Sequence, residues 1–525
     1  MTALSDAPPR DPTEPSPEYR SVPRFVIVAG VVIGLAGLFF YFYTRSAMWL
    51  DEALTVNIAR LPLSDLHAAL KQDGAPPLFY VLLHFWTAAF GTGNVAVRSL
   101  SGVFMVGATV AMWFAARRFA GVMAAWIAVA LMAANPYAIR YATEARMYSL
   151  EILFVATGLL AVQRALERPS VGRLSVVALL VAGFVYTQYW AFYLLAVVAV
   201  LLGYLAWRGV RRGAALRTLG AMAVGGVAFV PWLPTFLYQR AHTGTPWGIP
   251  LLPAIPFGYT LRDFGGGASG AGDLQEGWAL FLILIALLFI GVFGNAIDGR
   301  RIELDLWVPR RVRAVAFLFA FGLAVALTLN YFAGGAFQSR YSAIVFPFYV
   351  LLVSRGFTLL RDPRVLAGVL AVALVLGVVG GVRNVVTRRT QAPEVADVLR
   401  REAKPGDLVV YCPDQVGPAV HRLAPSGLRE VVFPSFAGPE RIDWVDYKAR
   451  VNAANIKNFA HKALAGAGNH TLWYVSAPGY ITHTGKCEAI SDEFAAARPR
   501  QQRTLSDEKI FEKPALQMFP ARAPG

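Results

Sequence analysis

The chain has 525 residues, of which 56% are hydrophobic and only 16% are charged, and its formal net charge is +16. This composition indicates a polytopic membrane protein and argues against a soluble enzyme. The positive charge does not indicate nucleic-acid binding, because the arginines lie in short clusters between apolar runs and form no basic stripe interleaved with aromatic side chains.

The N-terminal residues 1–23 are rich in proline and polar groups, and we expect them to form a disordered cytoplasmic tail. The apolar run from Phe25 to Tyr43 is too long for the core of a signal peptide and has no small-residue cleavage site after it. We therefore predict an uncleaved first transmembrane helix.

Further apolar runs predict an all-α membrane bundle of about eleven transmembrane helices within residues 24–386, because each run approaches the length that crosses the hydrocarbon core of a bilayer. The predicted helices span residues 24–43, 97–117, 121–139, 148–165, 174–189, 190–207, 217–237, 278–296, 313–333, 341–360 and 365–386.

The arginines between these helices set the orientation. If the N-terminus is cytoplasmic, every cluster between predicted helices falls on the cytoplasmic side, as the positive-inside rule requires. This predicts a multi-pass protein of the cytoplasmic (inner) membrane. The clusters are Arg10, Arg20 and Arg24; Arg117 and Arg118; Arg164, Arg168 and Arg173; Arg208, Arg211, Arg212 and Arg217; Arg300, Arg301, Arg310, Arg311 and Arg313; and Arg361 and Arg364.

One apolar stretch, residues 76–91, is too short for a confident span, and counting it as one would move the next arginine cluster outside. We interpret it as an external helix in the membrane interface, beginning at a proline pair. The loop 44–96 is then entirely external and carries interfacial helices. Asp51 and Glu52 lie in this loop, and two adjacent like charges at a membrane surface indicate a functional role.

Three predicted external loops bring acids, arginines and tyrosines to the outer face. Such a set suits a reaction that needs a base and an anion clamp, since the planar arginine fork binds phosphate through two parallel hydrogen bonds. The candidate residues are Asp51, Glu52 and Asp73 in the first loop, Arg140, Glu144, Arg146 and Tyr148 in the second, and Arg340 and Tyr341 in the third.

Structural roles remain open for several of these groups. An isolated arginine next to the membrane often snorkels to lipid headgroups. Glu144 could form an ion pair with Arg140 or Arg146 at a helix end. The tryptophans fit an interfacial aromatic belt, and His84 suits packing or a headgroup contact better than metal ligation.

Residues 387–525 follow the last predicted helix and would form an extracytoplasmic domain, although Arg383, Arg388 and Arg389 at that exit depart from the positive-inside pattern. Strand-like runs such as "GDLVVYCP" and "HTLWYVSAP", with the helical run "APEVADVLRREA", predict a small α/β domain.

The two cysteines of the chain, Cys412 and Cys487, both lie in this C-terminal part. An oxidising compartment makes a disulfide between them the preferred interpretation, and two buried free thiols are the alternative. With no CxxC pair or Cys/His cluster, the sequence gives no support for a structural zinc site.

Five segments, in order, resemble the GT-C glycosyltransferase superfamily, and in particular its family 39-like branch of protein O-mannosyltransferases and aminoarabinose transferases. They are "WLDE", "APPLFYVLLHFWTAAFG", "AVRSLSGVF", "NPYAIRYATEARMYSL" and "SRYSAIVFPFYVLL". The resemblance covers residues 25–386, and the tail beyond about residue 390 matches no named family. Ala75 precedes the proline pair where relatives often have a polar residue, so a metal site known there in some relatives is in doubt.

The resemblance implies an inverting transfer of a sugar from a polyprenyl-phosphate carrier to an extracytoplasmic glycan, glycolipid or protein. One carboxylate suffices as base, because a lipid phosphate leaves as a stabilised anion. Asp51 is the expected base, and Glu52 would orient the acceptor or hold Asp51. The resemblance fixes no cofactor, and Glu144 would bind sugar hydroxyls or a divalent cation. The expected donor-binding and sugar-binding residues are Glu144, Arg146, Tyr148, Arg140, Arg340 and Tyr341.

Two other functions would also place charged groups in a membrane protein of this kind. A transporter or flippase of a lipid-linked or anionic substrate would also need charged groups, but the sequence shows no inverted repeat and no matching pair of Gly/Pro-broken helices. A receptor anchored by the bundle would leave the acidic pair unexplained. The sequence does not distinguish mannose from arabinofuranose as the sugar.

Overall fold

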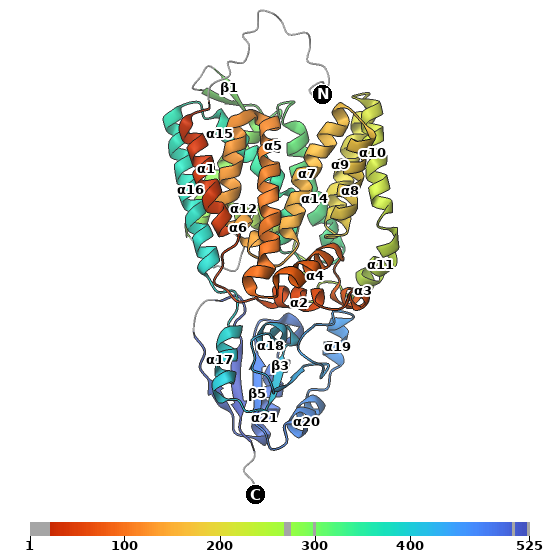
Figure 1. Ribbon diagram of the computed structural model, residues 1–525, viewed down its shortest axis with the longest axis vertical. Helices are drawn as coiled ribbons and strands as arrows, with labels where there is room; N and C mark the ends of the chain where they lie inside the picture. Colours follow the sequence, from red (N-terminus) through yellow and green to blue (C-terminus); the bar gives the residue numbers. More distant parts are fainter. Residues whose placement is uncertain (1–21, 267–274, 298–300, 507–509, 522–525) are drawn as a thin grey trace, which may run out of the picture.

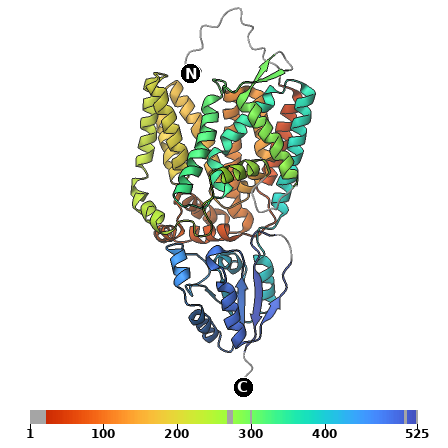
Figure 2. The same ribbon diagram turned by 180° about the vertical axis from the view of Figure 1, so that it is seen from behind.

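The computed structural model describes residues 22–266, 275–297, 301–506 and 510–521. It consists of a helical bundle and a smaller α/β domain that lies beyond one end of the bundle (Figure 1). The view from behind shows the same two layers (Figure 2). This architecture confirms the predicted fold class of a mostly helical bundle followed by a small C-terminal sheet domain.

Apolar helices build the bundle. By length and composition, six described helical segments could cross a membrane, and several shorter apolar helices accompany them. The long helices of the bundle are α1 (Arg24–Phe40), α5 (Asn94–Ala134), α7 (Tyr148–Glu167), α8 (Val171–Val185), α9 (Ala191–Trp207), α10 (Arg212–Val227), α13 (Gln275–Phe293), α14 (Arg313–Phe332), α15 (Phe346–Leu359) and α16 (Pro363–Val386).

Helix α5 is two helices joined at a sharp kink at Ala120 and Gly121, and Gly121 has a φ of 90°, a conformation that favours glycine. The kink lies where the sequence predicts the boundary between spans 97–117 and 121–139. The predicted span 217–237 is instead broken into α10, a 3₁₀ turn η1 (Val230–Trp232) and α11 (Leu233–His242). Pro231 and Pro234 explain the break, because proline supplies no backbone N–H and clashes with the preceding turn.

Short helices gather at the end of the bundle that faces the α/β domain (Figure 1). The segment 76–91 forms α4, and the sequence did not specify the boundaries of the others. The 3₁₀ segment η2 takes the first turns of the predicted span 341–360. The helices at this end are α2 (Leu50–Ala59), α3 (Leu63–Asp73) and α4 (Leu78–Phe90). The other short elements of the bundle are α6 (Pro136–Ala142), α12 (Ala254–Gly266) and η2 (Ser339–Val345). The opposite end carries the N-terminal end of α1 and a hairpin of β1 (Gly294–Ile297) and β2 (Arg301–Leu304).

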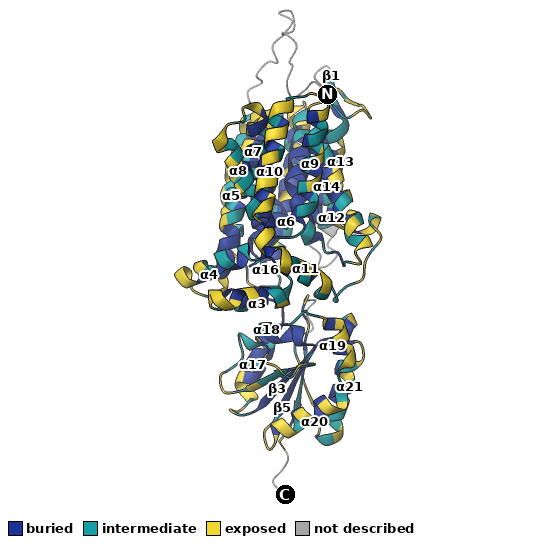
Figure 3. Ribbon diagram, turned by 90° about the vertical axis from the view of Figure 1, so that its right-hand side faces the viewer, coloured by how far each residue is buried: buried dark blue, intermediate teal, exposed yellow. Residues whose placement is uncertain are grey.

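The C-terminal domain contains a five-stranded sheet of order β4-β3-β5-β7-β6. Strand β3 is parallel to both of its neighbours, β4 and β5, whereas β7 is antiparallel to β5. Buried strands lie between helices whose outer faces are exposed (Figure 3). Its elements are α17 (Ala392–Glu402), β3 (Leu408–Cys412), η3 (Asp414–Val416), α18 (Gly417–His421), β4 (Arg429–Val432), α19 (Tyr447–Ala453), α20 (Ile456–Ala467), β5 (Leu472–Ser476), η4 (Ile481–His483), α21 (Lys486–Ala497), β6 (Gln501–Arg503) and β7 (Ala515–Phe519).

Hydrogen bonds attach this domain to the short helices. The Asn57 side chain of α2 donates to the Glu440 carbonyl at 2.7 Å, and the Arg422 guanidinium donates to the Asn57 side chain and to the Thr92 carbonyl. Trp444 donates its backbone N–H to the Gln72 carbonyl at 3.1 Å. The end of α2 and the C-terminal domain are therefore joined directly.

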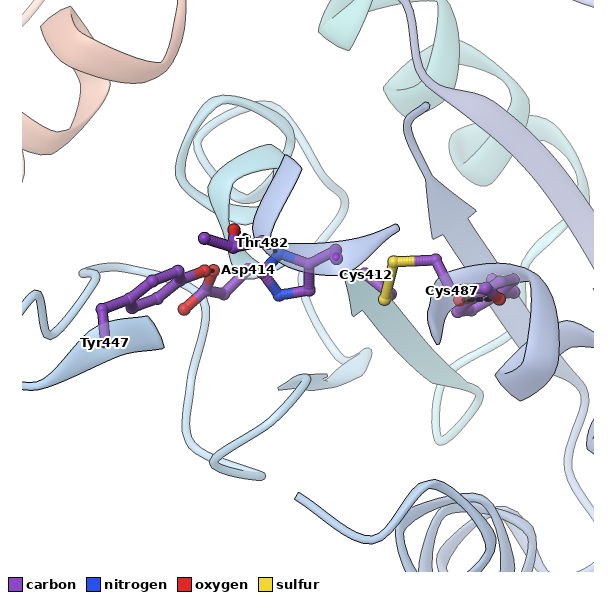
Figure 4. The surroundings of a disulfide bond; sticks show 7 residues. Cys412, Asp414, Tyr447, Thr482 and Cys487 are labelled. Carbon is purple, nitrogen blue, oxygen red and sulfur yellow. Dashed lines mark hydrogen bonds between the residues drawn. A yellow bond between two sulfur atoms is a disulfide. The ribbon is translucent and has the colours of Figure 1, made fainter. Parts of the chain in front are cut away.

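A disulfide joins Cys412, at the end of β3, to Cys487, at the start of α21, across 75 residues of sequence (Figure 4). We expect its removal by paired serine substitutions to cost the C-terminal domain roughly 2–5 kcal/mol, because the unfolded chain regains the freedom of a long closed loop. Thermal unfolding of the purified protein in nanodiscs would measure the loss. Non-reducing peptide mapping should find the linked peptides, and two freely alkylated cysteines would contradict the bridge.

Candidate active site

The acidic pair lies in the first turn of α2, immediately after the chain leaves α1 and an extended segment. A helix N-terminus favours negative charge, because its free N–H groups and the helix dipole point toward it. Trp49 at the N-cap supplies no side-chain hydrogen bond. Instead, the carboxylate of Glu512, from the C-terminal domain, accepts a hydrogen bond from the Leu50 N–H at 2.6 Å.

Asp51 forms an ion pair with Arg340 of η2, with 2.8 Å between Oδ2 and Nη1. Both side chains keep some exposure, 17% for Asp51 and 18% for Arg340. The Arg340 guanidinium also lies over the Trp49 ring, 5.6 Å from its centroid, and over Tyr341 at 5.7 Å. The fold thus brings the first and third predicted loops together at Asp51.

The second predicted loop reaches the same place through Arg146. Its Nη1 donates to the Thr55 hydroxyl at 2.8 Å, and that hydroxyl donates to the Asp51 carbonyl at 2.6 Å. Burial alone would lower the pKa of Arg146, but the negative groups around it, among them the carboxylates of Asp51 and Asp73, raise it well above its ordinary value. Arg146 is therefore a fixed cation beside Asp51.

Asp73, at the end of α3, completes this side of the site. Its Oδ2 accepts a hydrogen bond from the Tyr80 hydroxyl at 2.7 Å, which ties α3 to α4. Burial raises the pKa of Asp73, and Arg146 and the Tyr80 hydroxyl offset part of that rise.

Arg140 and Glu144 form an ion pair with 2.9 Å between Nε and Oε2, and Arg140 lies 5.9 Å from the centroid of the Trp49 ring. Tyr341 stacks on Trp190 at 5.2 Å. The site is therefore lined by cations and aromatic faces, which suit a phosphate and a sugar ring respectively.

Several buried polar atoms of this site have no hydrogen-bond partner among the described residues. Buried polar groups in native proteins are nearly always satisfied, so such a concentration indicates a place where a polar ligand or water binds. These atoms are Trp49 Nε1, Glu144 Oε1, Arg146 Nε, Tyr148 Oη, Arg340 Nε and both carboxylate oxygens of Glu151.

Glu52 occupies a different environment from Asp51. It is fully buried and accepts two hydrogen bonds from Arg98, at 2.6 and 2.5 Å, and one from the Ala145 N–H at 3.0 Å. Arg389 Nη1 lies 3.8 Å from Oε2. Burial alone would raise the pKa of Glu52, but the charges and hydrogen bonds of these neighbours lower it to about 2.

This placement corrects the expectation that Glu52 orients the acceptor or holds Asp51. Both of its oxygens are engaged by Arg98, and the side chain is shielded from the outer surface. Glu52 ties α2 to the start of α5 and to the chain after α16. Arg340 of the third loop pairs with Asp51 directly, and Arg146 of the second loop reaches its backbone carbonyl through Thr55.

Sequence reasoning missed Arg98, Arg389 and Glu512. A signal existed for the two arginines, because both lie on the predicted outer side and so depart from the positive-inside pattern. A buried acidic partner explains an arginine on that side, and Glu52 is the partner of both arginines. Glu512 carried no comparable signal.

The surroundings of Glu144 do not fit a metal ion. Its carboxylate faces a guanidinium, and the described residues contain no group of three His, Cys, Asp or Glu side chains that could hold a metal. A divalent cation prefers several oxygen ligands rather than cationic neighbours. We therefore derive no step through a metal.

An apolar groove runs beside α7 toward the opposite end of the bundle. It is bounded by α7, α8, α9, α10, α14 and α15. Phe154 and Val155, in the turns of α7 after Tyr148 and Glu151, line it, and further apolar residues follow as far as Leu166. The groove offers an apolar surface that begins near the polar site.

Glu512 gives a pH prediction, because burial raises its pKa to about 8. The folded protein therefore retains a proton that the unfolded chain has lost, so this contribution to stability is complete below the ordinary glutamate pKa of about 4.3 and is lost as the pH rises to about 8. We expect Glu512→Gln to reduce the fall in melting temperature between pH 5.5 and pH 8.5. Equal falls in wild type and variant would contradict this, and Glu440→Gln, at an exposed carboxylate, is the control.

The sequence and the fold of the chain can be compared with those of known proteins. Residues 74–238 match a family model described as dolichyl-phosphate-mannose-protein mannosyltransferase. No curated protein matches the chain by sequence.

Among solved structures, ArnT from Cupriavidus metallidurans bound to undecaprenyl phosphate is similar, with a TM-score of 0.55 and 13% identity over 94% of this chain and 97% of that one. Apo ArnT gives a TM-score of 0.54 and 13% identity over 95% and 98%. The Archaeoglobus fulgidus oligosaccharyltransferase tethered to an acceptor peptide gives 0.51 and 10% identity over 91% and 72%. At such identities these likenesses concern the fold.

Proposed function

We propose that this protein, which has the GT-C fold, is an inverting glycosyltransferase that moves a sugar from a polyprenyl-phosphate carrier to an acceptor hydroxyl outside the cytoplasm. The family model, which matches residues 74–238, and the shared fold support the superfamily that the sequence resembles. One observation carries the proposal: a partly exposed carboxylate, Asp51, lies among arginines that are oriented toward a polar site at the outer end of an apolar groove.

In the proposed reaction, Asp51 accepts the proton of an acceptor hydroxyl while the hydroxyl oxygen attacks the anomeric carbon. The bond from that carbon to the phosphate oxygen breaks, and polyprenyl phosphate leaves with the electron pair. Direct displacement inverts the anomeric centre. A positioned general base contributes typically about 10²–10⁴ in rate.

Arg340 and Arg146 are the proposed phosphate ligands. Each has a buried Nε without a hydrogen-bond partner among the described residues, and each is held near Asp51 by its other nitrogens. Cations placed at the leaving phosphate stabilise the charge that develops there. Tyr148, Arg140, Glu144 and Tyr341 line the adjoining space for the sugar.

The apolar groove beside α7 is the proposed place of the polyprenyl chain. Its lining is almost entirely hydrophobic, as an isoprenoid requires. ArnT, whose fold is similar, has been solved with undecaprenyl phosphate bound. Glu52 has a structural role in this scheme, because Arg98 donates hydrogen bonds to both of its carboxylate oxygens.

Release of free polyprenyl phosphate tests the function. The purified protein is mixed with a radiolabelled polyprenyl-phosphate-linked mannose or arabinofuranose and with a cell-envelope glycan fraction. Transfer of label and release of polyprenyl phosphate support the proposal. Movement of the intact lipid-linked sugar across a vesicle membrane, without cleavage, would favour the transporter alternative.

The proposed topology places residues 44–96 and 387–525 outside the cytoplasm. The described parts of both segments lie at the same end of the bundle, opposite the N-terminal end of α1 (Figure 1). We expect single cysteines at exposed positions Ser64 and Asn458 to react with a membrane-impermeant thiol reagent in intact cells, with Arg168→Cys as the cytoplasmic control. Labelling of the first two only after lysis would contradict this topology.

A further inference from the structure

A second cluster of polar groups lies at the carboxyl ends of the parallel strands of the C-terminal sheet. Strand β3 is followed by Asp414 and Gln415 in η3, and the chain after β5 leads to His483 in η4. In sheets of this kind, ligands bind in the crevice outside the carboxyl ends of the strands. This edge faces the bundle, because α18, directly after η3, packs against α2.

The cluster contains buried polar atoms that no described residue satisfies. The Gln415 side chain is 1% exposed, and its amide, which lies beside the Tyr447 hydroxyl, makes no hydrogen bond of good geometry; His483 is 3% exposed, and its Nε2 is unpaired among the described residues. The other imidazole nitrogen lies 3.1 Å from the Thr482 hydroxyl, and Asp414 accepts a hydrogen bond from the Tyr447 hydroxyl. Figure 4 shows Asp414 facing Tyr447, with Thr482 on its other side.

Leaving a buried amide and an imidazole nitrogen unpaired costs free energy, so a site of this kind is explained by a partner that arrives from outside. Two cations lie near the cluster, Lys486 and Arg450. Burial and the charge of Lys486 lower the pKa of His483 to about 4, so the imidazole is neutral. Arg450 is already bonded to the carbonyls of Val445 and Asp443 and to the Asp443 carboxylate.

Tyr480, half-buried between β5 and η4, connects this cluster with the catalytic acid. Burial raises the pKa of Tyr480, and the carboxylates of Glu512, Asp51 and Asp414 raise it further. Its hydroxyl therefore lies within the electrostatic reach of both Asp51 and Asp414.

We propose that Gln415, His483 and Tyr480 form the acceptor subsite of the enzyme, and that the acceptor is an uncharged, hydroxyl-rich glycan. The inference rests on the proposed function and adds the acceptor class to it. An amide and a neutral imidazole each donate and accept hydrogen bonds, as sugar hydroxyls do. Trp444, which packs 4.9 Å from Tyr447, adds an aromatic surface to the same edge.

Glycan binding in the absence of donor tests the subsite. Full-length protein in nanodiscs is titrated with mannotetraose and with a linear arabinofuranosyl tetrasaccharide, and binding is followed by saturation-transfer NMR. Wild type should bind at least one glycan. Gln415→Leu and His483→Phe should each weaken that binding about tenfold, the effect of losing one or two good hydrogen bonds. Tyr480→Ala, on a half-buried loop, should weaken it as well.

Matched controls come from exposed positions of the same domain. Gln502→Leu on β6 and His461→Phe on α20 should bind glycan as wild type does. Retained binding of undecaprenyl phosphate by every variant would show that the bundle is folded. Failure of wild type to bind either glycan, wild-type affinity in Gln415→Leu and His483→Phe, or displacement of the glycan by inorganic phosphate would each overturn the proposal.

Kinetics separate this inference from the proposed function. If the chain transfers sugar, Gln415→Leu should raise the KM for the glycan about tenfold and leave turnover at saturating glycan unchanged. A lower kcat with an unchanged KM would contradict a binding role. A protein that binds glycans but never cleaves the donor would refute the transferase function and leave the glycan site standing.

Discussion

Asp51→Asn is expected to lower sugar transfer by about 10²–10⁴ while donor binding persists, because asparagine keeps the size of the side chain but cannot accept the proton of the acceptor. The oxygen that faces Arg340 is retained, so the geometry of α2 and η2 should hold. Single-turnover transfer and equilibrium binding of polyprenyl phosphate are the two measurements. Transfer at nearly the wild-type rate would mean that the carboxylate is structural.

Arg340→Ala provides the contrast. It removes a charge-assisted contact to the donor phosphate, worth roughly 1.5–3 kcal/mol, and so should weaken polyprenyl phosphate binding by about 10–150-fold. The change also frees Asp51 from its ion pair. The two variants should thus separate: Asp51→Asn binds the donor without transfer, and Arg340→Ala binds it poorly. Equal donor affinity in both would contradict the phosphate role of Arg340.

Glu52→Ala should destabilise the protein by about 3–5 kcal/mol, because it leaves the buried guanidinium of Arg98 without its carboxylate. Arg389 would lose a counter-charge as well. Thermal unfolding in nanodiscs, with Arg98→Met tested alone and in combination, would measure the coupling. The double variant should be less damaged than the sum of the single ones.

The control is the ion pair between Arg118 of α5 and Glu167 of α7, near the opposite end of the bundle. Both partners are well exposed, 36% and 42%, so Glu167→Ala should cost no more than about 1 kcal/mol. If the two substitutions cost the same, burial would not be what makes the Glu52 pair important.

Periodicity and charge placement predicted much of the fold. Apolar runs and arginine clusters located most bundle helices, because hydrocarbon thickness and the positive-inside rule act on local sequence. The two prolines, Pro231 and Pro234, could have predicted the break of that span. Helix α12 could not be predicted, because residues 254–266 carry glycine, proline and charge, and tertiary packing holds them in a helix.

The sequence predicted which loops supply residues to the candidate site, but it did not predict the different surroundings of the two acids. Asp51 and Glu52 are adjacent acids, and no sequence pattern distinguishes their surroundings. In the structure, Asp51 is partly exposed and pairs with Arg340, whereas Glu52 is buried beside Arg98 and Arg389. That difference depends on Arg98 and Arg389, which come from helix ends distant in sequence. Pairings over such separations have no local pattern, so only the folded chain reveals them.

The contact between Glu512 and the Leu50 N–H spans 462 positions of sequence, and this separation bears on how the enzyme is made. During synthesis, α2 emerges early, while its cap is still untranslated. Helix α2 can reach its final hydrogen bonding only after the segment around residue 512 has been made and has docked on it. Completion of the N-terminus of α2 therefore depends on synthesis of nearly the whole chain.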